Sequence, residues 1–193
     1  DFTNMATTAD FKNGLCINHN GNLWKIESFQ HVKPGKGPAF VRTKLRNLKT
    51  LRILENTFTA GVKIDVVRIE NRTYQYLYKE GEETYHFMNQ KNYEQISIQK
   101  SMINAPEFLK EGENVEIMFH AENEEPMSCN LPQNVNLAIE FTEPGEKGNT
   151  ATNALKPATT ETGAEIKVPL FINKGDVVKI DTSSGNYLER IKK

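Results

Sequence analysis

A lysine framed by glycines and prolines is the feature of this sequence that most suggests chemistry. The segment PGKGP places Lys36 between Gly35 and Gly37, with Pro34 and Pro38 outside the glycines. Glycine permits a positive φ and leaves no neighbouring side chain to shield the lysine, while proline fixes φ and favours extended backbone before it. The pattern predicts either a stiff hairpin tip that presents Lys36 to a partner or an ordinary Pro-Gly turn that carries a lysine.

The charge around this segment is strongly asymmetric. The chain has 24 Lys and Arg and 25 Asp and Glu, but residues 1–67 carry 10 basic and 5 acidic residues, residues 68–130 carry 6 and 12, and residues 131–193 carry 8 and 8. No acidic residue lies between Glu27 and Glu55. A basic face of this kind favours a polyanionic partner, although a solvated strand face balanced by the acidic middle third is an alternative. The basic residues in this window are Lys33, Lys36, Arg42, Lys44, Arg46, Lys49 and Arg52.

The sequence lacks the residue groupings that enzymes and metal sites use. It has no dinucleotide-binding, zinc-protease or serine-hydrolase motif, and the GKG at positions 35–37 lacks the Ser or Thr of a P-loop. The four histidines are scattered singly, and Cys16 and Cys129 have no metal-ligand spacing. We therefore expect no enzymatic activity, no metal and no cofactor. Since no run of 18 apolar residues and no secretory signal pattern occurs, we also expect a cytoplasmic protein without a membrane partner.

Short β-strands must position these residues, because hydrophobicity alternates with period two along most of the chain. Asn20 and Gly21 mark a hairpin, and residues 40–48 and 52–60 have the pattern of paired strands that meet at a tight connection. Helical periodicity is limited to residues 101–109. Many short strands of this spacing are typical of small β-barrels. We expect an all-β fold of three consecutive small β-barrels, residues 1–67, 68–130 and 131–193.

Three tyrosines lie on one face of a predicted strand, at positions 74, 76 and 78. Such a row could stack nucleic-acid bases, but a half-buried strand also needs an aromatic or apolar row on its core face. We interpret the tyrosines as core residues.

The segment 143–163 lacks apolar periodicity. A loop of that length inside a small barrel is usually functional or disordered. We therefore predict a long functional loop in the last third of the chain.

Three segments resemble one known family. Residues 32–50 closely resemble the first-domain tip of the bacterial elongation factor P family, with the sequence VKPGKGPAFVRTKLRNLKT. Residues 156–175 fit the signature of that family, with the sequence KPATTETGAEIKVPLFINKG, and residues 85–96 are also similar. The resemblance extends over the chain from Met5 onward, in order and without large insertions.

This resemblance implies three β-barrels in an L shape, an SH3-like, KOW-type first domain followed by two OB-type domains. It implies a factor without enzymatic activity that binds the ribosome, not DNA, between the peptidyl-tRNA and exit sites and relieves stalling on consecutive prolines. Alternatives are the elongation factor P-like paralogue, which has a different tip, and a general RNA-binding β-barrel protein.

The resemblance also implies roles for individual residues. Lys36 reaches the CCA end of the peptidyl-tRNA and is a candidate for modification, because many relatives carry an added group there that a lysine-modifying enzyme attaches. The remaining expected contacts are Lys33, Arg42, Lys44 and Arg46 at the tRNA backbone, Gly148, Asn149 and Thr150 at the exit-site codon of the mRNA, and Tyr187 and Arg190 at the small subunit.

Three positions depart from the usual pattern of the family. Asn149 replaces an aspartate and lacks its charge. Leu51 replaces a glycine, so a positive φ there would strain it by about 1 kcal/mol, and an apolar contact is an alternative role. Pro38 resembles a subgroup thought to work with an unmodified lysine. Because a rigid tip loses less entropy on docking, we expect Lys36 to act unmodified; a modified lysine is the alternative, since the neighbouring residues also resemble relatives that carry one.

Overall fold

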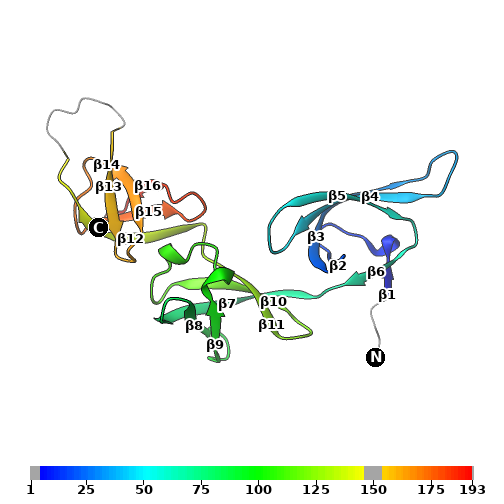
Figure 1. The fold of residues 1–193 in the computed structure, drawn as a ribbon, viewed down its shortest axis with the longest axis horizontal. Helices are drawn as coiled ribbons and strands as arrows, with labels where there is room; N and C mark the ends of the chain where they lie inside the picture. The colour runs from blue at the N-terminus through cyan, green and yellow to red at the C-terminus, as the bar shows by residue number, and fades with distance from the viewer. Residues whose placement is uncertain (1–4, 146–153, 193) are drawn as a thin grey trace. The chain divides into compact units, whose positions relative to one another are not determined.

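The computed structural model describes residues 5–145 and 154–192, which consist almost entirely of β-strands (Figure 1). The strands form three curled sheets that follow one another along the chain. The expectation of an all-β fold is confirmed, whereas the limits of the three domains stay a prediction. None of the helices in the described ranges is long and apolar enough to cross a membrane.

The first sheet has six strands in the order β1-β6-β2-β3-β4-β5. Alternate residues of a strand point to opposite faces, and in β4 Val41, Thr43 and Leu45 are buried while Arg42 and Lys44 are exposed. The inward residues pack into one core with the buried aromatic rings that follow β1 and lie in β5. The elements are β1 Met5–Thr7, the 3-10 helix η1 Thr8–Asp10, β2 Cys16–His19, β3 Asn22–Val32, β4 Phe40–Asn47, β5 Ile53–Thr59 and β6 Lys63–Val66.

The second and third sheets each have five strands, in the orders β11-β10-β7-β8-β9 and β14-β13-β12-β15-β16. The predicted helical segment forms two single 3-10 turns, because Pro106 begins the second of them. The elements are β7 Ile69–Glu80, β8 Thr84–Asn89, β9 Gln95–Gln99, η2 Lys100–Met102, η3 Pro106–Phe108, β10 Asn114–His120, β11 Glu125–Asn130, β12 Asn134–Thr142, β13 Leu155–Thr160, β14 Glu165–Pro169, β15 Val177–Asp181 and β16 Tyr187–Arg190.

The chain divides into two compact units. The first reaches to Glu70 and includes residues 119–125, where β10 turns into β11. The second contains residues 71–118 and everything from Pro126 onward, so the second and third sheets belong together.

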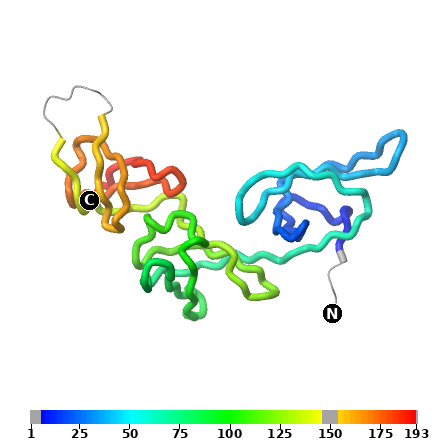
Figure 2. The backbone as a smooth tube through the Cα atoms, viewed as in Figure 1, coloured from blue at the N-terminus to red at the C-terminus, as the bar shows by residue number. Residues whose placement is uncertain are grey.

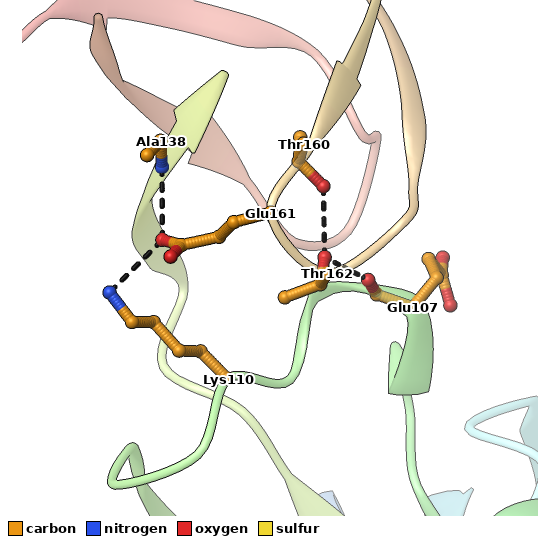
Figure 3. Close-up of polar contacts among 6 residues, drawn as sticks. All are labelled: Glu107, Lys110, Ala138, Thr160, Glu161 and Thr162. Carbon is orange, nitrogen blue, oxygen red and sulfur yellow. Dashed lines mark hydrogen bonds and ion pairs between the residues drawn. The ribbon is translucent and has the colours of Figure 1, made fainter. Parts of the chain in front are cut away.

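Side chains of the second and third sheets join these two sheets within the second unit (Figure 3). The Glu161 carboxylate lies 3.0 Å from the Lys110 ammonium and accepts a hydrogen bond of 3.0 Å from the amide of Ala138. The Thr162 hydroxyl donates to the carbonyl of Glu107 at 2.6 Å. These contacts link the turn after β13 to η3 and the segment that follows it.

A β-bulge divides the tyrosine row of β7. Tyr74 and Tyr76 are 3% and 5% exposed, and the ring of Tyr76 packs against Phe87. The register shifts between Tyr76 and Tyr78, so that Tyr78 is 47% exposed and stacks on His86 with ring centroids 4.4 Å apart. The core interpretation is confirmed for two tyrosines and wrong for Tyr78, because an inserted residue reverses the alternation of faces.

The loop predicted over residues 143–163 is partly a strand. Its second half forms β13, which pairs with β12 and β14. The buried face of β13 consists of Lys156, Ala158 and Thr160. The prediction is wrong for this half because a strand that buries polar and small residues has no apolar alternation.

Candidate nucleic-acid interface

Strand β4 carries three of the predicted RNA-binding cations on one face. Arg42, Lys44 and Arg46 occupy alternate positions, opposite the face that enters the core. Paired residues of antiparallel strands share a face, and Lys25 of β3 is paired with Arg46. We call Lys25, Arg42, Lys44 and Arg46 the basic row. Sequence reasoning missed Lys25, because only the register of β3 on β4 places it in the row.

A groove of about 470 Å³ lies along this face. Its lining includes Arg42 and Lys44 from β4, Ser28 and Gln30 from β3, and Thr57 from β5. Cations beside amide and hydroxyl groups are the donors that contact phosphate and sugar oxygens in nucleic-acid complexes. The groove therefore has the chemistry of a site for a nucleic-acid backbone.

The two acidic residues that bound the basic window lie against the row. Glu27 occupies a bulge in β3 and accepts a hydrogen bond of 2.6 Å from Arg46, and this bond lowers the pKa of the Glu27 carboxyl. Glu55 lies 3.8 Å from the Lys44 ammonium, and both side chains are exposed. A long, exposed ion pair contributes little. Lys44 is therefore available to a ligand, whereas Arg46 is engaged within the protein.

Three cations nearer the tip have no acidic partner. Lys33, Lys36 and Arg42 form no ion pair with any residue that the structure describes. The guanidinium of Arg42 lies over the ring of Phe40, with its central carbon 5.5 Å from the ring centroid. This contact orients Arg42 and leaves its N–H groups without a carboxylate. Cations without an acidic partner thus extend from the middle of β4 to the tip.

The hairpin between β3 and β4 projects from the rest of the first sheet (Figure 2). Its last pair is Val32 with Phe40, so residues 33–39 form the loop. Gly37 has a φ of 98°, in the left-handed region. Gly35 does not have a positive φ. Of the two tip glycines, Gly37 therefore uses the positive φ that glycine permits and Gly35 does not.

The tip is restrained by its prolines and not by hydrogen bonds. Residues 33–38 form no hydrogen bond with the described part of the chain, and Ala39 is the first to join the sheet, accepting a bond of 3.0 Å from Ala60. Lys36 is exposed. Pro34 and Pro38 are thus the local restraints on the backbone that carries it.

The other end of β4 leads into a loop that is fully hydrogen-bonded. The side-chain oxygen of Asn47 accepts hydrogen bonds from the backbone amides of Lys49 at 2.8 Å and Thr50 at 2.9 Å. The backbone amide of Asn47 donates to the carbonyl of Arg52 at 2.8 Å. Leu51 closes the turn with a φ of 61° and is 63% exposed. The positive φ that strains a leucine is therefore present, and most of the Leu51 side chain is exposed.

The predicted codon loop, Gly148, Asn149 and Thr150, lies outside the described residues. Next to it, the ammonium of Lys156, which is only 6% exposed, donates to the carbonyl of Glu143 at 2.6 Å. A Cβ on Gly145 would lie 2.8 Å from the carbonyl oxygen of Leu170, so only glycine fits there. The bond between Lys156 and Glu143 joins the described segments on either side of the predicted loop.

The two residues predicted at the small subunit lie together on β16. Tyr187 is half-buried, and its burial raises the pKa of its phenol. Arg190 is exposed, and its guanidinium lies 3.8 Å from Asp176 and over the ring of Phe171, 5.4 Å from the centroid. The exposed guanidinium of Arg190 therefore has one aromatic and one weak acidic contact.

The described residues contain no group of three or more His, Cys, Asp or Glu side chains that could hold a metal ion. Cys16 and Cys129 are both free thiols. Burial raises the pKa of the Cys129 thiol to about 12.

Models of protein families match nearly the whole chain. Residues 7–64 match the elongation factor P (EF-P) KOW-like domain, residues 69–129 the EF-P OB domain, and residues 135–190 the elongation factor P C-terminal domain. The chain belongs to the elongation factor P family. The KOW-like and OB types predicted for the first two domains are confirmed by these matches.

Curated members of the elongation factor P family are similar over their full length. Elongation factor P of Flavobacterium johnsoniae is 57% identical over 188 residues, which cover 97% of this chain and all of the relative. Elongation factor P 1 of Porphyromonas gingivalis is 55% identical with the same coverage, and elongation factor P of Mycobacterium avium is 48% identical over 97% of this chain and 99% of its own. Among solved structures, a translation initiation factor eif-5a family protein from Naegleria fowleri matches this chain with a TM-score of 0.50 and 15% identity. The match covers 65% of this chain and 96% of the other protein, and at this identity it shows a shared fold alone.

Proposed function

We propose that this protein is a translation elongation factor that binds the ribosome beside the peptidyl-tRNA and speeds peptide-bond formation on consecutive prolines. In this proposal the basic row lies along the acceptor arm of the tRNA, and Lys36 reaches its CCA end. The observation that carries the proposal is the position of Lys36 at the end of a strand whose outer face bears Arg42 and Lys44, in a member of the elongation factor P family.

The charges support an RNA backbone as the ligand. Lys33, Arg42 and Lys44 are exposed and have at most a weak acidic partner. Such cations gain affinity by releasing counterions from phosphates. Arg46, held by Glu27 at 2.6 Å, contributes less to that contact than the other three.

The mechanism that we propose is positional. Proline is a conformationally restricted nucleophile, and a prolyl peptide chain can hold the ester carbon of the peptidyl-tRNA in poor alignment. A factor that fixes the CCA end in a near-attack arrangement lowers the entropic part of the barrier without taking part in bond chemistry. Lys36 serves this role as an ammonium group that contacts the backbone of the CCA end.

We propose that Lys36 does so without an added group. The tip has no internal hydrogen bonds, so Pro34 and Pro38 carry the whole of its restraint. A backbone restricted before binding loses less entropy on binding. The intact mass of the protein from its own cells tests this point, since added mass that maps to Lys36 would reject it and point to a lysine-modifying enzyme as a partner.

For the third domain we propose contacts with the small subunit. Residues 148–150 approach the exit-site codon of the mRNA, and Tyr187 and Arg190 meet the subunit itself. The bond between Lys156 and Glu143 supports this proposal, because it joins the described segments that precede and follow the predicted codon loop.

Translation of a message with three consecutive proline codons tests the function. Purified protein is expected to shorten the pause at these codons and to leave a matched message without proline codons unchanged. An equally long pause with and without a saturating amount of protein would reject the proposal. A shortening on both messages would favour general RNA binding instead.

A further inference from the structure

One loop geometry occurs once in each sheet. The three loops are Asn47–Arg52, Asn89–Glu94 and Asp181–Asn186. In each loop, the backbone amide of the first residue donates to the carbonyl of the sixth, at 2.8, 2.8 and 3.0 Å respectively. The backbone amide of the fifth residue donates to the carbonyl of the first, at 2.9, 2.9 and 2.8 Å. The side chain of the first residue caps the amide of the third at 2.8, 2.7 and 2.9 Å. The fifth residue has a positive φ in each loop, 61° in Leu51, 63° in Tyr93 and 73° in Gly185.

The three loops differ in what occupies the strained position. The third loop has glycine, which adopts a positive φ without strain. A Cβ on Gly185 would lie 3.4 Å from the ring of Phe108 in η3, so this loop abuts the second sheet. Leu51 and Tyr93 are instead large, strained and 63% and 70% exposed. A large residue that is strained and mostly exposed is a candidate for contact with a partner.

The surroundings of Leu51 indicate which partner it meets. Lys49 and Arg52 flank it, both are exposed, and neither forms an ion pair with the described residues. The carbonyl of Leu51 accepts a hydrogen bond of 3.3 Å from Arg46, which belongs to the basic row. Ile53, which is 55% exposed and paired with Arg46, adds apolar surface on the same face. Exposed apolar side chains beside cations without an ion pair are suited to a nucleic acid, whose riboses and bases can contact the apolar groups and whose phosphates can contact the cations.

We propose that Leu51 is an apolar anchor that lies against the riboses and base edges of the RNA arm bound by the basic row. This inference rests on the proposed function. Lys36 lies before β4 and Leu51 after it, and the eight residues of the strand span roughly 25 Å at about 3.3 Å per residue. The minor groove of an RNA helix is wide and shallow and displays riboses and base edges, so a rigidly held leucine can enter it. The anchor then sets how far along the arm the tip can reach.

Substitution of the strained residues by glycine separates contact from stability. Leu51→Gly removes the side chain and relieves the positive φ, so the thermal unfolding midpoint should stay the same or rise while contact with RNA is lost. The factor concentration that gives half-maximal relief of a triple-proline pause should rise roughly fivefold, with the rate at saturation unchanged. Leu51→Met should restore the wild-type concentration dependence.

Tyr93→Gly is the matched control, because it relieves the same backbone conformation in a loop outside the basic face. It should leave the half-maximal concentration unchanged. An unchanged value for Leu51→Gly, or equal increases for the two glycine variants, would overturn the proposal.

A photoreactive phenylalanine analogue at position 51 identifies the partner directly on ribosomes that hold a peptidyl-tRNA. A cross-link to the tRNA supports the proposal. A cross-link only to ribosomal protein, or none while the same analogue at position 44 reacts with tRNA, overturns it. A cross-link from position 51 to tRNA in a protein that relieves no pause would retain the contact and reject the proposed function, so the two claims fail separately.

Discussion

The loops at the two ends of β4 are restrained in different ways. The loop before Phe40 has no internal hydrogen bonds, two prolines and an exposed lysine, whereas the loop after Asn47 is closed by backbone bonds and a buried asparagine cap. In the first loop the prolines restrict the backbone and the Lys36 side chain is exposed, and in the second the hydrogen bonds hold Leu51 at a positive φ. The comparison indicates an anchor at one end of the basic row and a probe at the other.

Removal of two cations of the basic row, Arg42 and Lys44, should have the largest effect. Arg42→Ala combined with Lys44→Ala should weaken ribosome binding about tenfold or more at low salt and flatten the dependence of log affinity on log salt by about two units, because two phosphate contacts are lost. Binding measured from 50 to 200 mM salt checks this. A salt slope equal to that of the wild type would show that these cations do not face RNA.

Loss of the Asn47 cap should destabilise the loop that carries Leu51. Asn47→Ala leaves the amides of Lys49 and Thr50 without their acceptor, so the free energy of unfolding should fall by about 1–2 kcal/mol. Asn89→Ala removes the same cap in the second sheet and should cost a similar amount. Denaturant unfolding monitored by Trp24 in the first domain should detect the first change, and no effect of Asn47→Ala would reject the assigned role of the cap.

A looser tip should have a smaller effect. Pro38→Gly frees a backbone held by no hydrogen bond, so the half-maximal concentration for pause relief should rise about fivefold at unchanged thermal stability, as expected for about 1 kcal/mol of added entropy cost. NMR relaxation of residues 35–39 should show greater motion on the picosecond to nanosecond timescale. Wild-type activity with a visibly more mobile tip would show that the stiffness of the tip is not what matters.

The smallest expected effect concerns the ion pair that ties β3 to β4. Arg46 lowers the pKa of Glu27 below its ordinary value of 4.5 in the folded protein. The ion pair therefore stabilises the fold fully at any pH above the ordinary pKa of Glu27. This stabilisation is lost as the pH falls through the lowered pKa of the folded protein. Wild type should exceed Glu27→Gln in stability at pH 7, and the difference should vanish at strongly acidic pH. A difference that stays constant across this range would contradict the assignment.

The fold class and the three members of the basic row on β4 could be predicted from the sequence, whereas Lys25 could not. Period-two alternation in β4 puts Val41 and Leu45 in the core, which leaves Arg42 and Lys44 on the outer face. The resemblance to the family supplied Lys36 as the functional residue.

The parts that could not be predicted depend on register and on local polar contacts. A bulge at Glu27 brings an acid onto Arg46, and another before Tyr78 turns that ring out of the core. Neither bulge leaves a mark in the hydrophobic pattern. The buried face of β13 is polar, and its Lys156 finds its partner in the carbonyl of Glu143, so no apolar pattern indicated a strand there.

The central claim is that Lys36 acts on the peptidyl-tRNA while the basic row supplies affinity. Pre-steady-state formation of a prolyl-prolyl bond, followed at increasing factor concentration, tests it most directly. We expect Lys36→Ala to keep the fold and the half-maximal concentration of the wild type but to lower the rate at saturation at least tenfold, close to that of ribosomes without factor. A Lys36→Ala protein that reaches the wild-type rate at saturation would contradict the account.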